Sequence, residues 1–248
     1  MKIKVVSYNV RSGRNDEDTE ARSYDFCADV IATISPDIIG LCEMGRHSHG
    51  ALFPTLKLGC EPHEYLGEKL SMNSCFSRSI VTSDGCPYGN ALLTKFPVLS
   101  HRTVPIPDPT VKREGGRYES RSVLVCELDV EGGLTVLVSH FGLEAEEKEN
   151  AVKTVLSIID EIKTPFLLMG DFNCEPQDSY MTPLFERLCD TAEGKPYPLT
   201  WPSNFEKRHR ARVKIDYIFT SKGARTHSLE SLETLASDHL PLIAEIEI

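Results

Sequence analysis

The sequence predicts an α/β fold in which two packed sheets are covered by helices, in one domain spanning residues 1–248. Three observations predict this class. Strand-like runs recur along the whole chain, helical patterns lie between them, and no repeat, low-complexity segment or linker divides the chain. The length of 248 residues is sufficient to bury a large hydrophobic core.

The first half of the chain is expected to begin with a strand at residues 3–10 and a helix at 23–35, whose apolar residues recur at helical spacing. Pro36 ends this helix, because the residue before a proline is disfavoured in the helical region. Residues 46–75 are rich in Gly, Pro and His, and we expect them to be irregular. Further strands are expected at residues 38–42, 75–82, 90–94 and 101–106.

The second half opens with a loop at 107–120 and a hairpin, whose turn is the sequence Glu131-Gly132-Gly133. A helix is expected at 144–162, because acidic residues crowd its first turns, where the helix dipole favours them, and an apolar stripe follows. A long loop covers 190–213. The remaining elements are strands at 122–130, 134–139, 166–169, 215–220 and 240–248 and a helix at 178–188.

Composition limits the cellular setting and the partners. The chain has 27 basic and 37 acidic residues, a formal net charge of −10, which disfavours broad non-specific binding to nucleic acid. No apolar run approaches the roughly 18 residues of a membrane helix, and Met1 to Val10 alternates like a strand rather than a signal peptide. We therefore expect a cytoplasmic protein that is not an integral membrane protein. The eight cysteines show no C-x-x-C spacing, and we expect free, buried thiols.

Polar side chains stand where several predicted strands begin or end. Because a rigid sheet can present such residues in one cleft, we expect them to converge. These residues are Asn9, Glu43, His140, Asp171, Asn173, Asp216, Asp238 and His239.

The residue types at these positions predict a chemistry. Carboxylates and amides without thiolates suit an oxygen-preferring cation such as Mg²⁺ or Mn²⁺. Two histidines beside it suit the oxygens of a phosphoryl group. Asp171 and Asn173 face the same side if their segment is extended, and a turn would also present them. Together these features predict metal-assisted hydrolysis of a phosphate ester.

The same residues lie in motifs that resemble the endonuclease/exonuclease/phosphatase superfamily, the DNase I-like fold. The motifs follow the family's order and span almost the whole chain. They are Ser7-Tyr8-Asn9-Val10, Leu41-Cys42-Glu43, the run from Gly89 to Pro97, Ser139-His140-Phe141, Gly170-Asp171-Phe172-Asn173, Ile215-Asp216-Tyr217-Ile218 and Ser237-Asp238-His239-Leu240-Pro241.

The resemblance implies a four-layer α/β/β/α sandwich and a role for each matching residue. Glu43 would be the principal ligand of a Mg²⁺ or Mn²⁺ ion, with Asn9 beside it and Asp238 helping to hold the metal. Asp171 would activate the attacking water, and Asn173 would orient that water or the phosphate.

The resemblance also implies how the phosphate is bound. His140 and His239 would bind it and stabilise the charge that develops on it, and Asp216 would pair with His239. Asp216 has an alternative reading as an ion-pair partner of Lys214 or Arg212. Arg121 matches the frequent active-site arginine of the family, with Arg117 as a rival.

Three further residues are candidates for binding the substrate, each with a structural alternative. Asn90 either contacts the substrate or supports its strand. Trp201 is either a loop anchor or a stacking platform for a ring. Arg210 belongs to the basic run 207–214, which is either a solvated loop or a loop over the cleft that meets an anionic substrate.

The predicted function is that of a Mg²⁺- or Mn²⁺-dependent hydrolase of phosphate esters, either a phosphodiesterase or a phosphatase. A nuclease acting on DNA or RNA is the alternative, so the partner is a small molecule, a lipid head group or a nucleic acid. A catalytically silent binding module would require a lost ligand or histidine, and none is lost. The net charge of −10 and the single short basic run favour a compact substrate, with 46–75 and 107–120 as possible walls.

Overall fold

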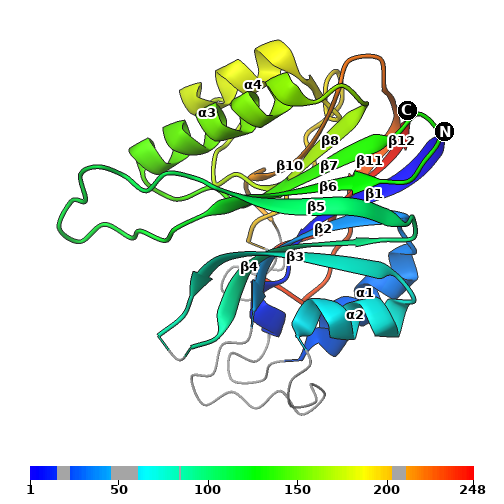
Figure 1. Ribbon diagram of the computed structural model, residues 1–248, viewed down its shortest axis with the longest axis horizontal. Coiled ribbons are helices and arrows are strands. Elements are labelled where there is room, and N and C mark those ends of the chain that lie inside the picture. The colour runs from blue at the N-terminus through cyan, green and yellow to red at the C-terminus, as the bar shows by residue number, and fades with distance from the viewer. Residues whose placement is uncertain (16–22, 46–60, 84, 203–210) are drawn as a thin grey trace.

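The computed structural model has four layers (Figure 1). Two six-stranded β-sheets lie face to face, and helices cover the outer face of each sheet. This arrangement confirms the predicted α/β/β/α sandwich. The structure describes residues 1–15, 23–45, 61–83, 85–202 and 211–248.

The first sheet carries both ends of the chain. Its elements, with the helices on its outer face, are β1 (Lys2–Asn9), η1 (Arg11–Gly13), α1 (Tyr24–Ile34), β2 (Ile38–Gly45), α2 (Pro62–Leu70), β3 (Asn73–Val81), β4 (Pro87–Thr94), β11 (Arg225–Ser231) and β12 (Leu242–Glu247). The strand order is β11-β12-β1-β2-β4-β3. β1 pairs in parallel with β2 and antiparallel with β12, and the Met1 amino group donates to the Ile248 carbonyl.

The second sheet supplies the other half of the sandwich, with the strand order β5-β6-β7-β8-β10-β9. Its elements and its covering helices are β5 (Val98–Pro105), β6 (Ser122–Leu128), β7 (Leu134–Ser139), α3 (Ala145–Glu161), β8 (Phe166–Asp171), η2 (Ser179–Met181), α4 (Thr182–Arg187), β9 (Cys189–Asp190) and β10 (Asp216–Thr220). β7 and β8 run parallel, and β10 runs antiparallel to β8. No helix within the described ranges is long and apolar enough to cross a membrane.

Three apolar layers hold the four structural layers together. One lies beneath α1 and α2, one between the sheets, and one beneath α3 and α4. Central strands such as β8 are buried on both faces, which explains why their sequences are apolar almost throughout. Representative residues of the three layers are, in order, Ile31 and Leu41, Leu92 and Val136, and Val155 and Leu168.

The expectation that 46–75 is irregular is wrong for its second half, where α2 covers Pro62–Leu70. The helix begins with a reciprocal capping box between Glu61 and Glu64, and Pro62 occupies its first turn. This start signal is present in the sequence. The apolar stripe is weak, however, because only a few residues of the helix are buried, and the periodicity therefore does not stand out.

β11 is also absent from the sequence-based prediction. It is an edge strand in which no residue is fully buried, so the alternation of apolar and polar residues that marks a strand is missing. Backbone pairing with β12 places it, and Leu229 packs against the core between the sheets. The predicted helix at 178–188 is divided into η2 and the short α4, and the predicted loop 190–213 begins with the end of β9.

The cysteines follow the prediction within the described residues. All seven that the structure describes are free, and five of them are buried. Cys60 lies outside the described residues. Burial raises the pKa of the Cys27 thiol to about 12, which keeps this thiol protonated and unreactive at neutral pH.

Gly170 is the penultimate residue of β8, and we expect that any side chain at this position would destabilise the fold. Its φ is +145°, and an added Cβ would lie 1.8 Å from the carbonyl oxygen of Ser139 on β7. We expect Gly170→Ala to lower the free energy of unfolding by about 3 kcal/mol or more, measured by urea denaturation. Gly132→Ala is the matched control, because Gly132 has φ +83° but no atom within 4 Å of the added Cβ. Equal losses in the two variants would contradict the steric explanation.

Candidate active site

The polar residues at the strand ends meet at one edge of the sandwich. β1 and β2 of the first sheet and β7 and β8 of the second all end there, and β10 begins there. Antiparallel pairing places Asp216 directly opposite Asp171. The loop before β12 is tied to the same edge, because the Ser237 hydroxyl donates to the Asn9 carbonyl over 2.7 Å.

Asn9, at the end of β1, joins carboxylates from the two sheets. Its side-chain nitrogen donates to Glu43 Oε1 and to Asp171 Oδ2, each over 3.0 Å. Its side-chain oxygen accepts from the backbone N–H of Arg11, also over 3.0 Å. The amide is buried, so these contacts hold Glu43 and Asp171 near one point.

Glu43 is directed towards this point by an irregularity in β2. The predicted strand stops at residue 42, but β2 continues to Gly45 with a register shift against β4 between Leu41 and Met44. Glu43 lies within this shift and has φ +57°, a conformation that costs free energy in a residue with a side chain. Bulges of this kind re-aim a side chain at the edge of a site, and here the Glu43 carboxylate reaches Asn9.

Asp171 and Asn173 are brought together by a turn. Asn173 has φ +49°, and its backbone N–H donates to Asp171 Oδ1 over 3.0 Å. The assumption of an extended segment is therefore wrong, and the alternative of a turn holds, since Asx turns satisfy this pattern. Burial raises the pKa of Asp171 to about 7, a rise that His239 opposes and Asp216 reinforces.

His239 lies between two buried carboxylates. Its Nδ1 is 2.9 Å from Asp216 Oδ2, and its Nε2 is 3.5 Å from Asp171 Oδ2. Burial disfavours the charged ring, but Asp216 and Asp171 outweigh this cost and raise the pKa of His239 to about 10. The ring is therefore an imidazolium at neutral pH. The alternative partner of Asp216, Lys214, is buried and donates instead to Asp190 over 2.8 Å.

His140 has the opposite charge state. Burial, with Arg121 and His239 nearby, holds its pKa well below the ordinary value, so the ring is neutral. Its Nδ1 lies 3.1 Å from Nη1 of Arg121, and its Nε2 lies 3.1 Å from the side-chain nitrogen of Asn173 and 3.5 Å from Asp171 Oδ2. A guanidinium only donates. The Asn173 nitrogen also donates to the Phe141 carbonyl over 2.9 Å, so the acceptor that faces Nε2 is Asp171 Oδ2. Nδ1 therefore accepts, and the ring proton is on Nε2.

Arg121 is itself held by a residue that the sequence-based prediction missed. Its side chain is 9% exposed, and its Nη2 lies 2.8 Å from Oε2 of Glu119. The sequence contained one signal for this pair, because Glu119 stands two residues before Arg121, which was already predicted to lie in the site. The structure thus places Arg121 against His140, while its rival Arg117 is exposed.

The donor set fits a divalent cation that prefers oxygen. Ligand atoms of Asp171, Asp216 and His239 lie within 4.8 Å of one another, and Asp216 Oδ1 is buried with no hydrogen-bond partner among the described residues. Nδ1 of His239 lies 2.9 Å from Asp216 Oδ2, and Mg²⁺ prefers oxygen ligands to imidazole nitrogen. The oxygen atoms around Asn9, from Glu43 and Asp171, are the better ligands. Asp238 lies beside this group, with its Oδ2 3.3 Å from Nε of Arg11.

The candidates for substrate binding are placed differently from one another. The Trp201 ring is 39% exposed and its centroid lies 6.3 Å from that of His239, so it borders the site. Asn90 is buried between the sheets, where its side-chain nitrogen donates to the Ser122 carbonyl over 2.9 Å. Arg210 lies outside the described residues. Of the basic run 207–214, the structure describes only the last four residues, in which Arg212 is exposed and Lys214 is buried.

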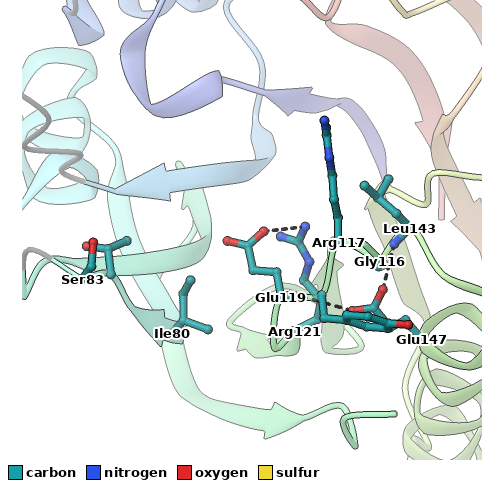
Figure 2. A pocket seen from close by; sticks show the side chains of 11 residues that line it. Ile80, Ser83, Gly116, Arg117, Glu119, Arg121, Leu143 and Glu147 are labelled. Carbon is teal, nitrogen blue, oxygen red and sulfur yellow. Dashed lines mark hydrogen bonds and ion pairs between the residues drawn. The ribbon is translucent and has the colours of Figure 1, made fainter. Parts of the chain in front are cut away.

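A pocket of about 590 Å³ adjoins the site (Figure 2). Arg121 lines it, and so do residues 116–119 of the segment 107–120 that the sequence analysis considered as a wall. The other proposed wall, 46–75, falls largely outside the described residues.

Comparisons with known proteins place this geometry in a family. The profile of the endonuclease/exonuclease/phosphatase family matches residues 6–239. Comparison with curated protein sequences gives no match.

Solved structures share the fold. A family protein from Leptotrichia buccalis has a TM-score of 0.76 at 21% identity, over 99% of this chain and 100% of that one. The mannosyl-6-phosphatase of Bacteroides thetaiotaomicron has a TM-score of 0.74 at 18% identity, over 99% of this chain and 100% of that one. The human Nocturnin catalytic domain with bound sulfate has a TM-score of 0.67 at 18% identity, over 99% of this chain and 93% of that one. The chain belongs to the endonuclease/exonuclease/phosphatase family, whose members hydrolyse phosphate esters.

Proposed function

We propose that the protein hydrolyses a compact phosphate ester, as a phosphatase or phosphodiesterase, with the help of Mg²⁺ or Mn²⁺. The observation that carries the proposal is the contact network centred on Asp171. One buried carboxylate is approached by Asn9 at the end of β1, His140 after β7 and His239 in the loop before β12. Such convergence of acid, amide and imidazole groups suits hydrolysis by an attacking water.

Glu43 would hold the cation, with Asp171 and Asp238 close by, and Asn9 would orient the Glu43 and Asp171 carboxylates through its side-chain nitrogen. When bound, the cation would neutralise charge on the phosphate and make a bound water more acidic. This assignment is supported by the ligand atoms themselves, since carboxylate oxygens are ligands that Mg²⁺ prefers in proteins.

Asp171 would accept the proton of the attacking water. Its Oδ1 is occupied by the backbone N–H of Asn173, which fixes the orientation of the carboxylate. Its Oδ2 accepts from the Asn9 side chain and lies 3.5 Å from Nε2 of each histidine, at the centre of the site, and this oxygen would act as the general base. Asn173, next to His140, is suited to orient the water or the phosphate.

The two histidines would bind the phosphoryl oxygens in different ways. His239 would contribute a positive charge, which Asp216 holds in place through Nδ1. His140 would contribute a neutral N–H donor, because Arg121 occupies its Nδ1 and leaves the proton on Nε2. Donors that are already oriented need no rearrangement as negative charge develops during the reaction.

Several observations support a compact substrate. The net charge is −10, and Lys214, the last cation of the only strongly basic run, is buried against Asp190 rather than presented to a polyanion. Among proteins of this fold, one is named a mannosyl-6-phosphatase and another holds a sulfate anion, which resembles phosphate in shape and charge.

The test is a paired hydrolysis assay at fixed Mg²⁺. One arm contains plasmid and single-stranded DNA, and the other contains small phosphomonoesters, phosphodiesters and phospholipid head groups. The Asp171→Asn variant, purified in the same way, is the blank for contaminating enzymes. Turnover of small esters well above the blank is the expected result. Cleavage confined to DNA would replace the proposal with the nuclease alternative, and no turnover in either arm would favour a silent binding module.

A further inference from the structure

The pocket beside the candidate active site is built from parts of the chain that are distant in sequence. Ile80 and Thr82 come from the β3–β4 hairpin, Arg117 and Glu119 from the segment before β6, and Leu143 from the segment before α3 (Figure 2). Its volume of about 590 Å³ lies within the roughly 300–1,000 Å³ usual for small-molecule sites.

The pocket shares a wall with the catalytic centre. Arg121 lines the pocket, and the same guanidinium lies 3.1 Å from His140. Gly142 and Leu143, on another side of the pocket, follow closely after His140 in the chain. A substrate whose phosphate lies at His140 would therefore extend its remaining part into this pocket.

Most charges around the pocket are already compensated. Glu119 is paired with Arg121 over 2.8 Å. The Glu147 carboxylate accepts from the backbone N–H groups of Leu143, Glu144 and Glu119 over 3.0–3.3 Å. The charge of these acids is thus neutralised or stabilised within the protein.

Arg117 differs from its neighbours. Its side chain is exposed, and no ion pair or hydrogen bond ties it to another residue within the described ranges. Figure 2 shows it extending away from the Glu119–Arg121 pair rather than joining it. Arg113, four residues earlier, is by contrast paired with Glu144. Within the part of the chain that the structure describes, Arg117 is therefore an uncompensated cation on a pocket that adjoins the proposed phosphate site.

We propose that Arg117 binds a second anionic group, a phosphate or a carboxylate, carried by the same compact substrate. The inference rests on the proposed function and specifies its substrate class. A guanidinium presents a planar fork of donors that matches both groups. Ile80 and Leu143 supply apolar walls for the body of the molecule, and the bounded volume suits a sugar or nucleoside rather than a polymer. The natural substrate is accordingly a small ester with two anionic groups.

The test compares substrates that differ by one phosphate, such as fructose 1,6-bisphosphate with fructose 6-phosphate and adenosine 3′,5′-bisphosphate with adenosine 5′-monophosphate. Arg117→Ala should raise KM for the bisphosphates by about 10- to 100-fold, the worth of a charge-assisted hydrogen bond. The kcat values and the KM for monophosphates should change by less than about twofold. Arg117→Lys should recover part of the loss, because it restores the charge without the fork.

Arg225→Ala is the matched control for the loss of one positive charge. Arg225 is opposite Glu247 in the sheet, and Glu247 is opposite Lys2, so this arginine lies at the far end from Asn9. Equal effects of Arg117→Ala on mono- and bisphosphates, or equal effects of the two alanine variants, would overturn the inference. An effect of Arg117→Ala limited to DNA cleavage would also overturn it, since the second phosphate would then belong to a polymer.

A second variant and a second measurement keep this inference separate from the proposed function. Ile80→Trp should fill part of the pocket and weaken bisphosphates more than p-nitrophenyl phosphate. Calorimetric titration of the bisphosphates into the Asp171→Asn variant measures binding without turnover. Binding that depends on Arg117, together with no hydrolysis by the wild type, would support the pocket and reject the enzyme. Hydrolysis by the wild type with no dependence of binding or rate on Arg117 would support the proposed function and reject the role of Arg117.

Discussion

Replacing Asp171 by asparagine should lower kcat for any phosphate ester that the protein hydrolyses by a factor of about 10² to 10⁴. The substitution keeps the size of the side chain and an oxygen that can accept from Asn173. It removes the negative charge that would accept the water's proton and that faces both His140 and His239. Steady-state kinetics with urea denaturation of the same samples separates lost chemistry from lost folding.

Asp37→Asn is the matched control for this change. Asp37 is also a partly buried, hydrogen-bonded carboxylate, which accepts from the Lys4 backbone N–H and pairs with Lys95. It lies at the opposite end of β1 and β2 from Asn9. Its loss should leave kcat unchanged. A kcat of Asp171→Asn within threefold of wild type would remove Asp171 from the catalytic machinery.

Chelation should abolish hydrolysis, and Mg²⁺ or Mn²⁺ should restore it. The reason is that the carboxylates of Glu43, Asp171 and Asp216 crowd one edge of the sandwich, and a divalent cation would balance their charge together with that of an incoming phosphate. The measurement is the initial rate of ester hydrolysis, first after EDTA has removed bound metal and then as Mg²⁺ or Mn²⁺ is added back in increasing concentration. Full activity in the presence of chelator would mean that no divalent ion takes part.

Two variants distinguish the ligands within this prediction. Glu43→Gln should raise the Mg²⁺ concentration needed for half-maximal rate by about 10- to 100-fold, since the principal charged ligand is lost. Asp238→Asn tests the assignment of Asp238, whose carboxylate faces Arg11. A similar shift for Asp238→Asn would make Asp238 a ligand. An unchanged Mg²⁺ requirement would limit it to the ion pair with Arg11.

The fold was largely predictable because its layers depend on patterns that are local in sequence. The apolar strands β7 and β8 are buried on both faces, and α3 buries one stripe that includes Val152 and Val155. Burial of such residues is what the sequence pattern encodes. β11 and α2 were not predicted from the sequence. The edge strand β11 buries none of its residues fully and α2 buries few, so neither element shows a clear periodic pattern of apolar residues.

The sequence by itself determined the α/β layering and the identities of the polar groups at the strand ends. It did not determine their partners, which only the tertiary structure decided. Asn9 contacts Asp171 across 162 positions, Glu43 is turned towards Asn9 by a bulge, and Arg121 sets the proton of His140. These features depend on the register of strands and the packing of two sheets. A local pattern specifies which face of a strand is buried, but the distance between atoms on different strands follows from the assembled fold.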